Sequence, residues 1–130
     1  MKLTKDFSTE EFLISKEYPE LLSGVMLTQD EIDKLYTLCA FGLQPIRDAY
    51  GPVVILSGFR TPELNRAVNG TIVSQHMRAE AVDFTVPGKV MARVFDTLLK
   101  WPGQCLFYTK KRFIHLALPR LGVQTLHTTK

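Results

Sequence analysis

Cysteine is scarce in this chain, and long apolar runs are missing from it. The two cysteines among 130 residues, Cys39 and Cys105, form neither a CxxC zinc pair nor a disulfide framework, so we expect two reduced thiols in the core. Because no apolar run is long enough to span a membrane as a helix, we expect no membrane partner. The first residues, MKLTKDFSTEEF, lack the apolar segment of a secretory signal, which predicts that the protein is cytoplasmic on synthesis.

A large excess of charge of either sign is also lacking. Sixteen basic residues against 13 acidic ones give a net charge of +3, a bias too small to indicate a nucleic-acid partner. We interpret the basic segment Lys110-Lys111-Arg112 as the solvated tip of a hairpin. Hydrophobic residues make up 45% of the chain and charged residues 22%, which excludes a mainly disordered protein. The length suits one domain over residues 1–130.

Helix signals dominate the first half of the sequence. Two capping boxes, Ser8 with Glu11 and Thr28 with Glu31, predict helix starts. Apolar residues follow Thr28 at helical spacing, and Pro45 should kink or divide that helix.

Strand signals dominate the second half. We predict strands at 53–57, 80–86, 105–108 and 113–118, and helices at 62–68 and 88–100. The strand at 53–57 should be buried, Val90 should lie on the core side of its helix, and the last two strands should form a hairpin. We expect the tail after Pro119 to be loosely held and His127 to be exposed without a role. The pattern is α+β, with N-terminal helices packed on a small, mostly antiparallel sheet.

Three residues have the side chains of a zinc site. His76 and Asp83 are seven positions apart, and His115 lies within an apolar strand. Imidazole and carboxylate are zinc ligands, and three protein ligands leave a fourth position open, as in catalytic sites. Two alternatives remain at this point. His115 can be a hydrogen-bonded core histidine, and Asp83 can pair with a buried arginine such as Arg60.

The stretch SGFRTPELNRAVNGTIVSQHMRAEAVDF, at 57–84, resembles the zinc D-Ala-D-Ala carboxypeptidase family, whose fold is shared with the hedgehog signalling domain. Its pattern is S-G-[YF]-R-[ST]-x-x-x-N followed by S-x-H-x-x-G-x-A-x-D. The segment LQPIRDAYG and the aromatic-Ile-His at 113–115 extend the resemblance over roughly 7–118. It is greatest to compact phage and bacterial members, and it implies a hedgehog/DD-peptidase-like fold.

The resemblance implies roles for particular residues. His76, Asp83 and His115 would bind Zn²⁺, and Arg60 would hold a substrate carbonyl or carboxylate beside the metal. A structural salt bridge is the alternative for Arg60. Ser74 would hydrogen-bond the Asp83 carboxylate or the loop backbone, or serve only as a turn residue. We interpret the two nearby asparagines, at 65 and 69, as helix-end and turn residues.

Two departures from the family pattern affect the prediction. Ala79 replaces a glycine, which can require a left-handed backbone. The catalytic Glu that usually precedes the last histidine is absent: Arg112 and Tyr108 occupy the expected places, and no acid follows Asp96. A related murein endopeptidase branch also has Tyr there, so Tyr108 is the candidate to stabilise a developing oxyanion. Glu80 is a weak candidate base, since it should point away from the metal.

The resemblance therefore implies a zinc-dependent peptidoglycan peptidase that acts next to D-Ala in the stem peptide. Such a protein would be phage-encoded, as a lysis enzyme or as part of a virion with other virion proteins as partners. The missing Glu supports an alternative, a catalytically weak or inactive structural or wall-binding protein of the same fold.

Overall fold

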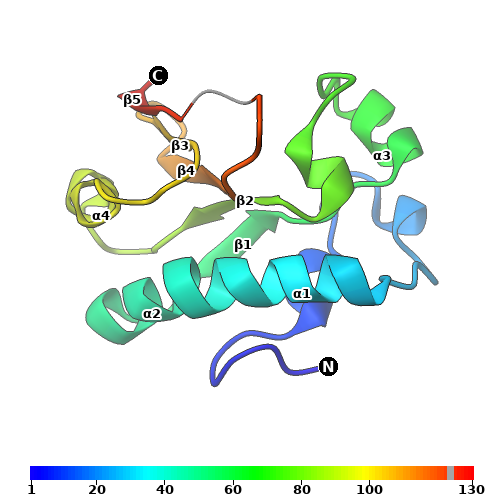
Figure 1. Cartoon of the computed structure of the whole chain (residues 1–130), viewed down its shortest axis with the longest axis horizontal. Helices are drawn as coiled ribbons and strands as arrows, with labels where there is room; N and C mark the ends of the chain where they lie inside the picture. The colour runs from blue at the N-terminus through cyan, green and yellow to red at the C-terminus, as the bar shows by residue number, and fades with distance from the viewer. Residues whose placement is uncertain (123–124) are drawn as a thin grey trace.

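The computed structural model describes residues 1–122 and 125–130 of the chain, and within them it shows helices and one mixed sheet (Figure 1). The α-helices are α1 (Gln29–Leu38), α2 (Gln44–Tyr50), α3 (Pro62–Ala67) and α4 (Met91–Thr97). Short 3-10 turns span Thr9–Phe12, Pro19–Leu21 and Gln75–Arg78, and a π-helical segment spans Cys39–Leu43. The strands are β1 (Val54–Ser57), β2 (Ala81–Thr85), β3 (Cys105–Tyr108), β4 (Phe113–Ala117) and β5 (His127–Thr129).

The helix α1 begins at the predicted capping box. The Thr28 hydroxyl accepts a hydrogen bond from the Glu31 amide at 3.2 Å, and the Glu31 carboxylate accepts one from the Thr28 amide at 2.9 Å. The helix is not divided at Pro45: Leu38, Leu43 and Gln44 all keep right-handed helical backbone angles, so α1 continues through the π-helical segment into α2. The irregularity associated with Pro45 is this π-helical segment, which lies just before it.

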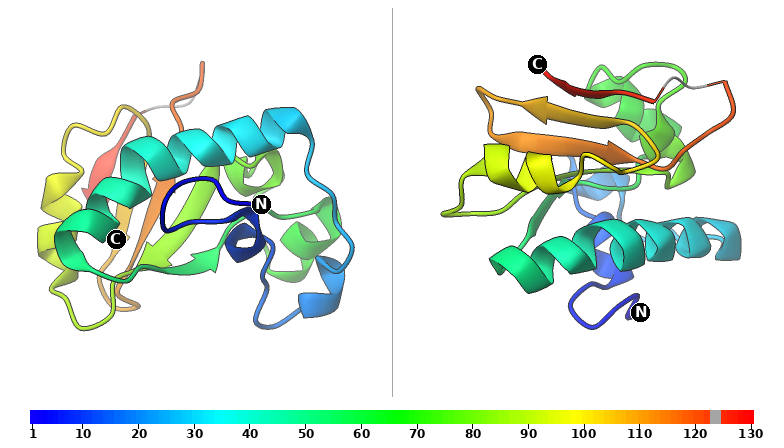
Figure 2. Two further views of the ribbon diagram at one scale, coloured as in Figure 1. Left: turned by 90° about the horizontal axis from the view of Figure 1, so that it is seen from below. Right: turned by 60° about the vertical axis from the view of Figure 1, so that its left-hand side comes forward.

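The sheet confirms the α+β prediction. Its strand order is β1-β2-β4-β3-β5, and every pairing is antiparallel except that of β3 with β5. The continuous rod formed by α1, the π-helical segment and α2 crosses one face of this sheet (Figures 1 and 2). The opposite face of the central strands is left for polar groups.

Alternation along the strands separates the core from this polar face. Val82 and Phe84 on β2, with Ile114 and Leu116 on β4, are fully buried in one cluster with the rod. Asp83 lies between Val82 and Phe84, so it points to the other face. The rod contributes Leu35, Leu38, Cys39 and Leu43 to the cluster.

Two predictions about burial are wrong. The strand at 53–57 was expected to be buried, but β1 is an edge strand that pairs only with β2, and Val54 and Leu56 remain 44% and 47% exposed. Its continuous apolar sequence therefore does not reflect burial on both faces. The last helix begins at Met91, later than predicted. Val90 is its N-cap and is 62% exposed, so it does not lie on the core side.

The predictions for the C-terminal tail are also wrong in part. Residues 127–129 form β5, which pairs in parallel with β3, so this part of the tail is held by the sheet. His127 is half-buried; its ring stacks on Phe95 with centroids 3.8 Å apart, and its Nε2 lies 3.0 Å from the Phe95 carbonyl oxygen. Short polar sequences give no apolar pattern from which such an edge strand can be predicted. Residues 123–124 of the tail lie outside the described residues.

No helix in the described part of the chain is long and apolar enough to cross a membrane.

Candidate metal centre

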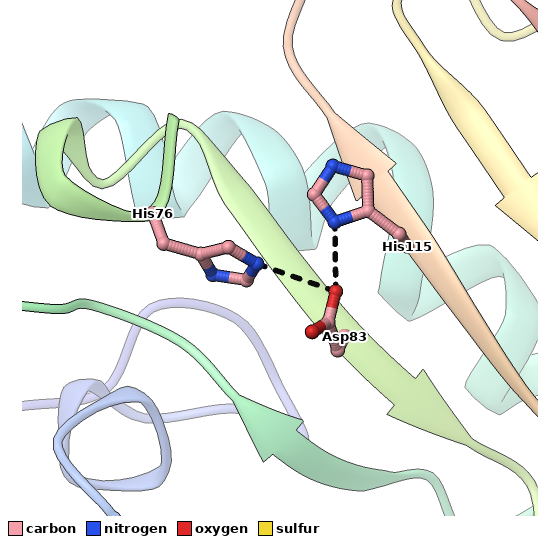
Figure 3. Close-up of side chains that lie close together, drawn as sticks. All are labelled: His76, Asp83 and His115. Carbon is pink, nitrogen blue, oxygen red and sulfur yellow. Dashed lines mark hydrogen bonds and ion pairs between the residues drawn. The ribbon is translucent and has the colours of Figure 1, made fainter. Parts of the chain in front are cut away.

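Three elements bring His76, Asp83 and His115 together (Figure 3). His76 lies in the 3-10 turn before β2, Asp83 at the centre of β2, and His115 directly opposite Asp83 on β4. His115 Nδ1 lies 2.8 Å from Asp83 Oδ1, and His76 Nε2 lies 3.3 Å from the same oxygen. Figure 3 shows both imidazoles pointing at the carboxylate on the sheet face turned away from α1.

The hydrogen bonding of His76 leaves its metal-binding nitrogen without a proton. Its Nδ1 lies 2.8 Å from the Gly58 carbonyl oxygen, which can only accept, so Nδ1 carries the proton of the neutral ring. Nε2 then presents a lone pair to an acceptor oxygen of Asp83. Two lone pairs facing each other at this distance need a proton or a metal cation near them.

Gly58 is fixed by close packing. A Cβ at this position would lie 2.7 Å from the backbone of Phe12, so only glycine lets the strand end lie against the N-terminal turn. The neighbouring Phe59 amide donates to the Phe12 carbonyl at 2.9 Å. The first 3-10 turn therefore helps to place the carbonyl that orients His76.

The electrostatics of Asp83 suit a metal ligand. Burial by itself raises the pKa of this carboxyl, but its contacts with the His115 and His76 imidazoles outweigh burial and hold the pKa well below its usual range. Asp83 is therefore ionised at every pH at which the protein would work.

The donor set fits a zinc ion. One ligand atom from each of the three residues lies within 4.8 Å of the others. Ligands of a tetrahedral zinc, bound at about 2.0–2.1 Å, lie about 3.3 Å apart, so small side-chain adjustments would suffice. Two imidazoles and one carboxylate would leave a fourth position open, and all three residues line one pocket.

The loop that carries His76 shows how the sequence departure is tolerated. Ala79 adopts the left-handed conformation, with φ of 58°, where the family has glycine. This conformation is modestly strained for alanine. Ser74 is the N-cap of the turn, and its hydroxyl accepts from the His76 amide at 3.2 Å. Of the two predicted roles for Ser74, the structure shows the bond to the loop backbone.

Arg60 lies beside the candidate ligands. Its backbone amide donates to the His76 carbonyl at 3.0 Å, and its NH2 group lies 4.0 Å from Asp83 Oδ2. The side chain is 16% exposed and lines the pocket. Burial lowers the pKa of Arg60, while the Asp83 charge raises it, and the group remains cationic.

Asn65 lies in the last turn of α3, as expected for a helix-end residue, and its side chain also holds neighbouring groups. Its side chain is buried; its Nδ2 donates to the Thr71 carbonyl at 2.8 Å, and its Oδ1 accepts from Arg60 NH1 at 3.3 Å. A Cβ on Gly70 would lie 2.0 Å from Asn65 Oδ1, so any other residue here would displace the Asn65 side chain from Arg60. Asn69 is the expected turn residue, with φ of 57°. In the sequence, the position of Asn65 five residues after Arg60 and just before the Asn69-Gly70 turn could have indicated its contact with Arg60.

The open side of the centre is a pocket of about 400 Å³. Leu106 and Tyr108 of β3 line it, with the Tyr108 ring stacked on Phe113 at a centroid distance of 4.5 Å. Gln104, which sequence reasoning did not single out, also lines it. Other lining residues are Asn69, Gly70, Thr71, Val73, Ser74 and Gln75, with Arg60 and the three candidate ligands.

A second carboxylate is missing from the described residues that line the pocket, where Asp83 is the only acid. Glu80 points to the opposite face, as predicted, and pairs there with Lys34 of α1. Arg112 is exposed in the turn between β3 and β4, with φ of 57°, and does not line the pocket. Of the two residues at the expected places of the catalytic Glu, only Tyr108 lines the pocket.

The cysteines take no part in this centre. Cys39 and Cys105 are both free and buried, as predicted. Burial raises the pKa of each thiol to about 12, so neither forms the thiolate that binds metals.

We expect the double variant Cys39→Ala, Cys105→Ala to keep the metal content of the wild type. Metal analysis of both proteins, purified without chelator, checks this. The small cavities would lower the free energy of unfolding without changing the metal content. A disulfide detected by mass spectrometry in freshly prepared wild-type protein would contradict the assignment of two free thiols.

Comparison with known proteins agrees with this geometry. A family model described as peptidase M15 matches residues 5–117, which include all three candidate ligands. A comparison with curated proteins finds no match. Because the family model covers most of the chain, the protein belongs to the peptidase M15 family, the family of the zinc D-Ala-D-Ala carboxypeptidases.

Proposed function

We propose that the protein is a zinc-dependent peptidase that hydrolyses a bond next to D-alanine in the peptidoglycan stem peptide. One observation carries this proposal: His76, Asp83 and His115 converge at the base of an open pocket that Arg60 also lines. A purely structural metal site has four protein ligands and no open position. Membership of a peptidase family supports hydrolysis of a peptide bond.

Different residues of the pocket would perform different parts of the reaction. A zinc ion held by His76, Asp83 and His115 would supply Lewis-acid chemistry for the scissile carbonyl and for water. The Arg60 guanidinium, held by Asn65 and near Asp83, is placed to pair with a carbonyl or carboxylate of the substrate. The Tyr108 hydroxyl can donate a hydrogen bond to the oxyanion that develops at that carbonyl.

The missing carboxylate supports a second candidate function. Asp83 is the only acid among the described lining residues, so the pocket lacks a second carboxylate that could accept a proton from water. The alternative is a catalytically weak or inactive wall-binding or structural protein, such as a virion component that contacts other virion proteins. A phage origin suits both functions, with release at lysis for the peptidase.

Soluble disaccharide-pentapeptides from peptidoglycan separate these functions. We expect the zinc-loaded protein to release D-alanine or a shorter peptide, slowly, and a chelator to stop the release. Chromatography with mass analysis identifies the bond that is cut. Sedimentation with insoluble peptidoglycan, without any released fragment, would instead support the wall-binding alternative.

We expect Tyr108→Glu to raise the rate of hydrolysis at least about tenfold, because a positioned general base typically contributes about 10²–10⁴-fold. Loss of the stacking on Phe113 offsets part of this gain. Steady-state kinetics on the same substrate measures the change.

Two matched variants control for charge and for shape. Tyr108→Gln has no ionisable group, and Arg112→Glu places a carboxylate outside the pocket, so neither should be faster than the wild type. Equal rates in Tyr108→Glu and Tyr108→Gln would show that this position cannot provide the base.

A further inference from the structure

Glu80 lies in a buried polar network on the face of the sheet opposite the metal centre. The residue is only 8% exposed. Its Oε2 lies 3.0 Å from Lys34 Nζ, and its Oε1 accepts from Gln75 Nε2 at 3.4 Å. The Arg120 guanidinium approaches Oε1 at 4.0 Å. Burying a carboxylate is costly unless it is paired, and here three polar side chains surround it.

The network joins the two segments that carry the histidines. Gln75 immediately precedes His76, and its side chain also donates to the Leu118 carbonyl at 3.1 Å. Leu118 follows β4, three residues after His115, and its amide donates to the Glu80 carbonyl at 2.8 Å. The Glu80 amide in turn donates to the Gln75 carbonyl at 3.0 Å. The Glu80 backbone therefore bridges the two segments directly. The Glu80 side chain accepts from Gln75, whose side-chain amide makes the second link, to Leu118.

Lys34 ties this bridge to the rod of helices beneath the sheet. It lies on α1 and pairs with Glu80 on one side and with Asp30, one turn earlier, at 3.1 Å on the other. The two pairs differ in exposure: the Asp30 side chain is 78% exposed and the Glu80 side chain 11%. An exposed pair contributes little, so the buried pair is the one that fixes the network to α1.

We propose that Glu80 is a positioning residue of the metal centre, which holds the turn carrying His76 against the end of the strand carrying His115. Glu80 does not itself line the pocket or contact a candidate ligand; it acts through Gln75, which does line the pocket, and through Leu118. The inference rests on the proposed function only in that zinc is taken to bind the triad. Groups that orient metal ligands from behind typically change metal affinity about 10–100-fold.

Zinc affinity of the apoprotein, measured by competition with a chromophoric chelator, tests the proposal without any peptide substrate. We expect Glu80→Gln to bind zinc at least about tenfold more weakly than the wild type. The matched control is Asp30→Asn, which removes the other partner of Lys34 and should stay within about twofold of the wild type.

Substitution of cobalt(II) for zinc provides a measurement that a general loss of stability would not change. In the Co²⁺-saturated protein, the visible absorption spectrum reports ligand geometry. We expect a changed spectrum for Glu80→Gln and an unchanged one for Asp30→Asn. If Glu80→Gln does not fold, Gln75→Met removes the same side-chain bridge without leaving a charge unpaired, and it should weaken zinc binding in the same direction.

The outcomes are distinct. Wild-type zinc affinity and cobalt spectrum in Glu80→Gln, or in Gln75→Met where the first variant is unfolded, would overturn the inference, even if the melting temperature falls. A wild-type protein that binds no zinc would contradict the metal centre itself. A wild-type protein that binds zinc but cuts no stem peptide would contradict only the proposed function.

Discussion

The variant His115→Ala is expected to lose zinc binding and, with it, hydrolysis. His115 stands directly opposite Asp83 on the neighbouring strand and provides one of three candidate ligands. Binding of a structural zinc by four ligands contributes about 10–16 kcal/mol, so loss of one ligand should weaken binding at least about 100-fold. Metal analysis after purification without chelator should find the variant without the zinc that the wild type carries.

His127→Ala is the matched control for this result. His127 also lies on a strand of the sheet, but it stacks on Phe95 and is not among the candidate ligands. Its replacement should reduce stability slightly and leave the zinc content of the wild type. Full zinc content in His115→Ala would remove the assignment of His115 as a ligand.

Acidification should also release the metal. An imidazole must be unprotonated to bind zinc, and histidines ordinarily take up protons near pH 6. Because the pKa of Asp83 lies well below its usual range, its carboxylate stays ionised through this range. Zinc occupancy should therefore fall on acidification, because the imidazoles and not the carboxylate take up the protons that compete with the metal.

The variant Arg60→Ala is expected to hydrolyse stem peptides at least about 100-fold more slowly, the usual cost of removing one group that stabilises the developing charge. The guanidinium lines the pocket and is held by the Asn65 side chain, so its position is fixed before substrate binds. Zinc content should not change, because the backbone contact of Arg60 with His76 does not need the side chain.

Two controls distinguish catalysis from a structural salt bridge. Arg66→Ala removes an exposed arginine of α3 that does not line the pocket, and it should leave the rate unchanged. Arg60→Lys keeps the charge but not the planar fork, so it should restore only part of the rate. A lower melting temperature with an unchanged rate in Arg60→Ala would mean that the contact with Asp83 is only structural.

The candidate site could be predicted from the sequence because its residues belong to short motifs on predictable elements. The alternation of Val82, Asp83 and Phe84 already places the carboxylate on the face opposite the core. The hairpin that carries His115 is equally local, since one turn connects its two strands. Local patterns were sufficient for these parts of the fold.

What could not be predicted depends on contacts between distant segments. The burial of β1 depends on its place at the sheet edge, and β5 forms only because β3 offers an unpaired edge to a polar tail. The Glu80 network joins α1 to a residue 46 positions later along the chain. Hydrophobic periodicity within a short stretch of sequence does not indicate pairings between segments that are far apart in the chain.

The rate of stem-peptide hydrolysis as a function of added zinc decides whether the protein is a zinc peptidase. The apoprotein, prepared with a chelator and dialysed, is titrated with zinc while product release is measured. We expect no release without zinc, a linear rise of the rate up to one equivalent per chain, and a plateau beyond it, since one triad holds one ion. A rate that does not depend on zinc, or no release from the fully zinc-loaded protein, would contradict the account.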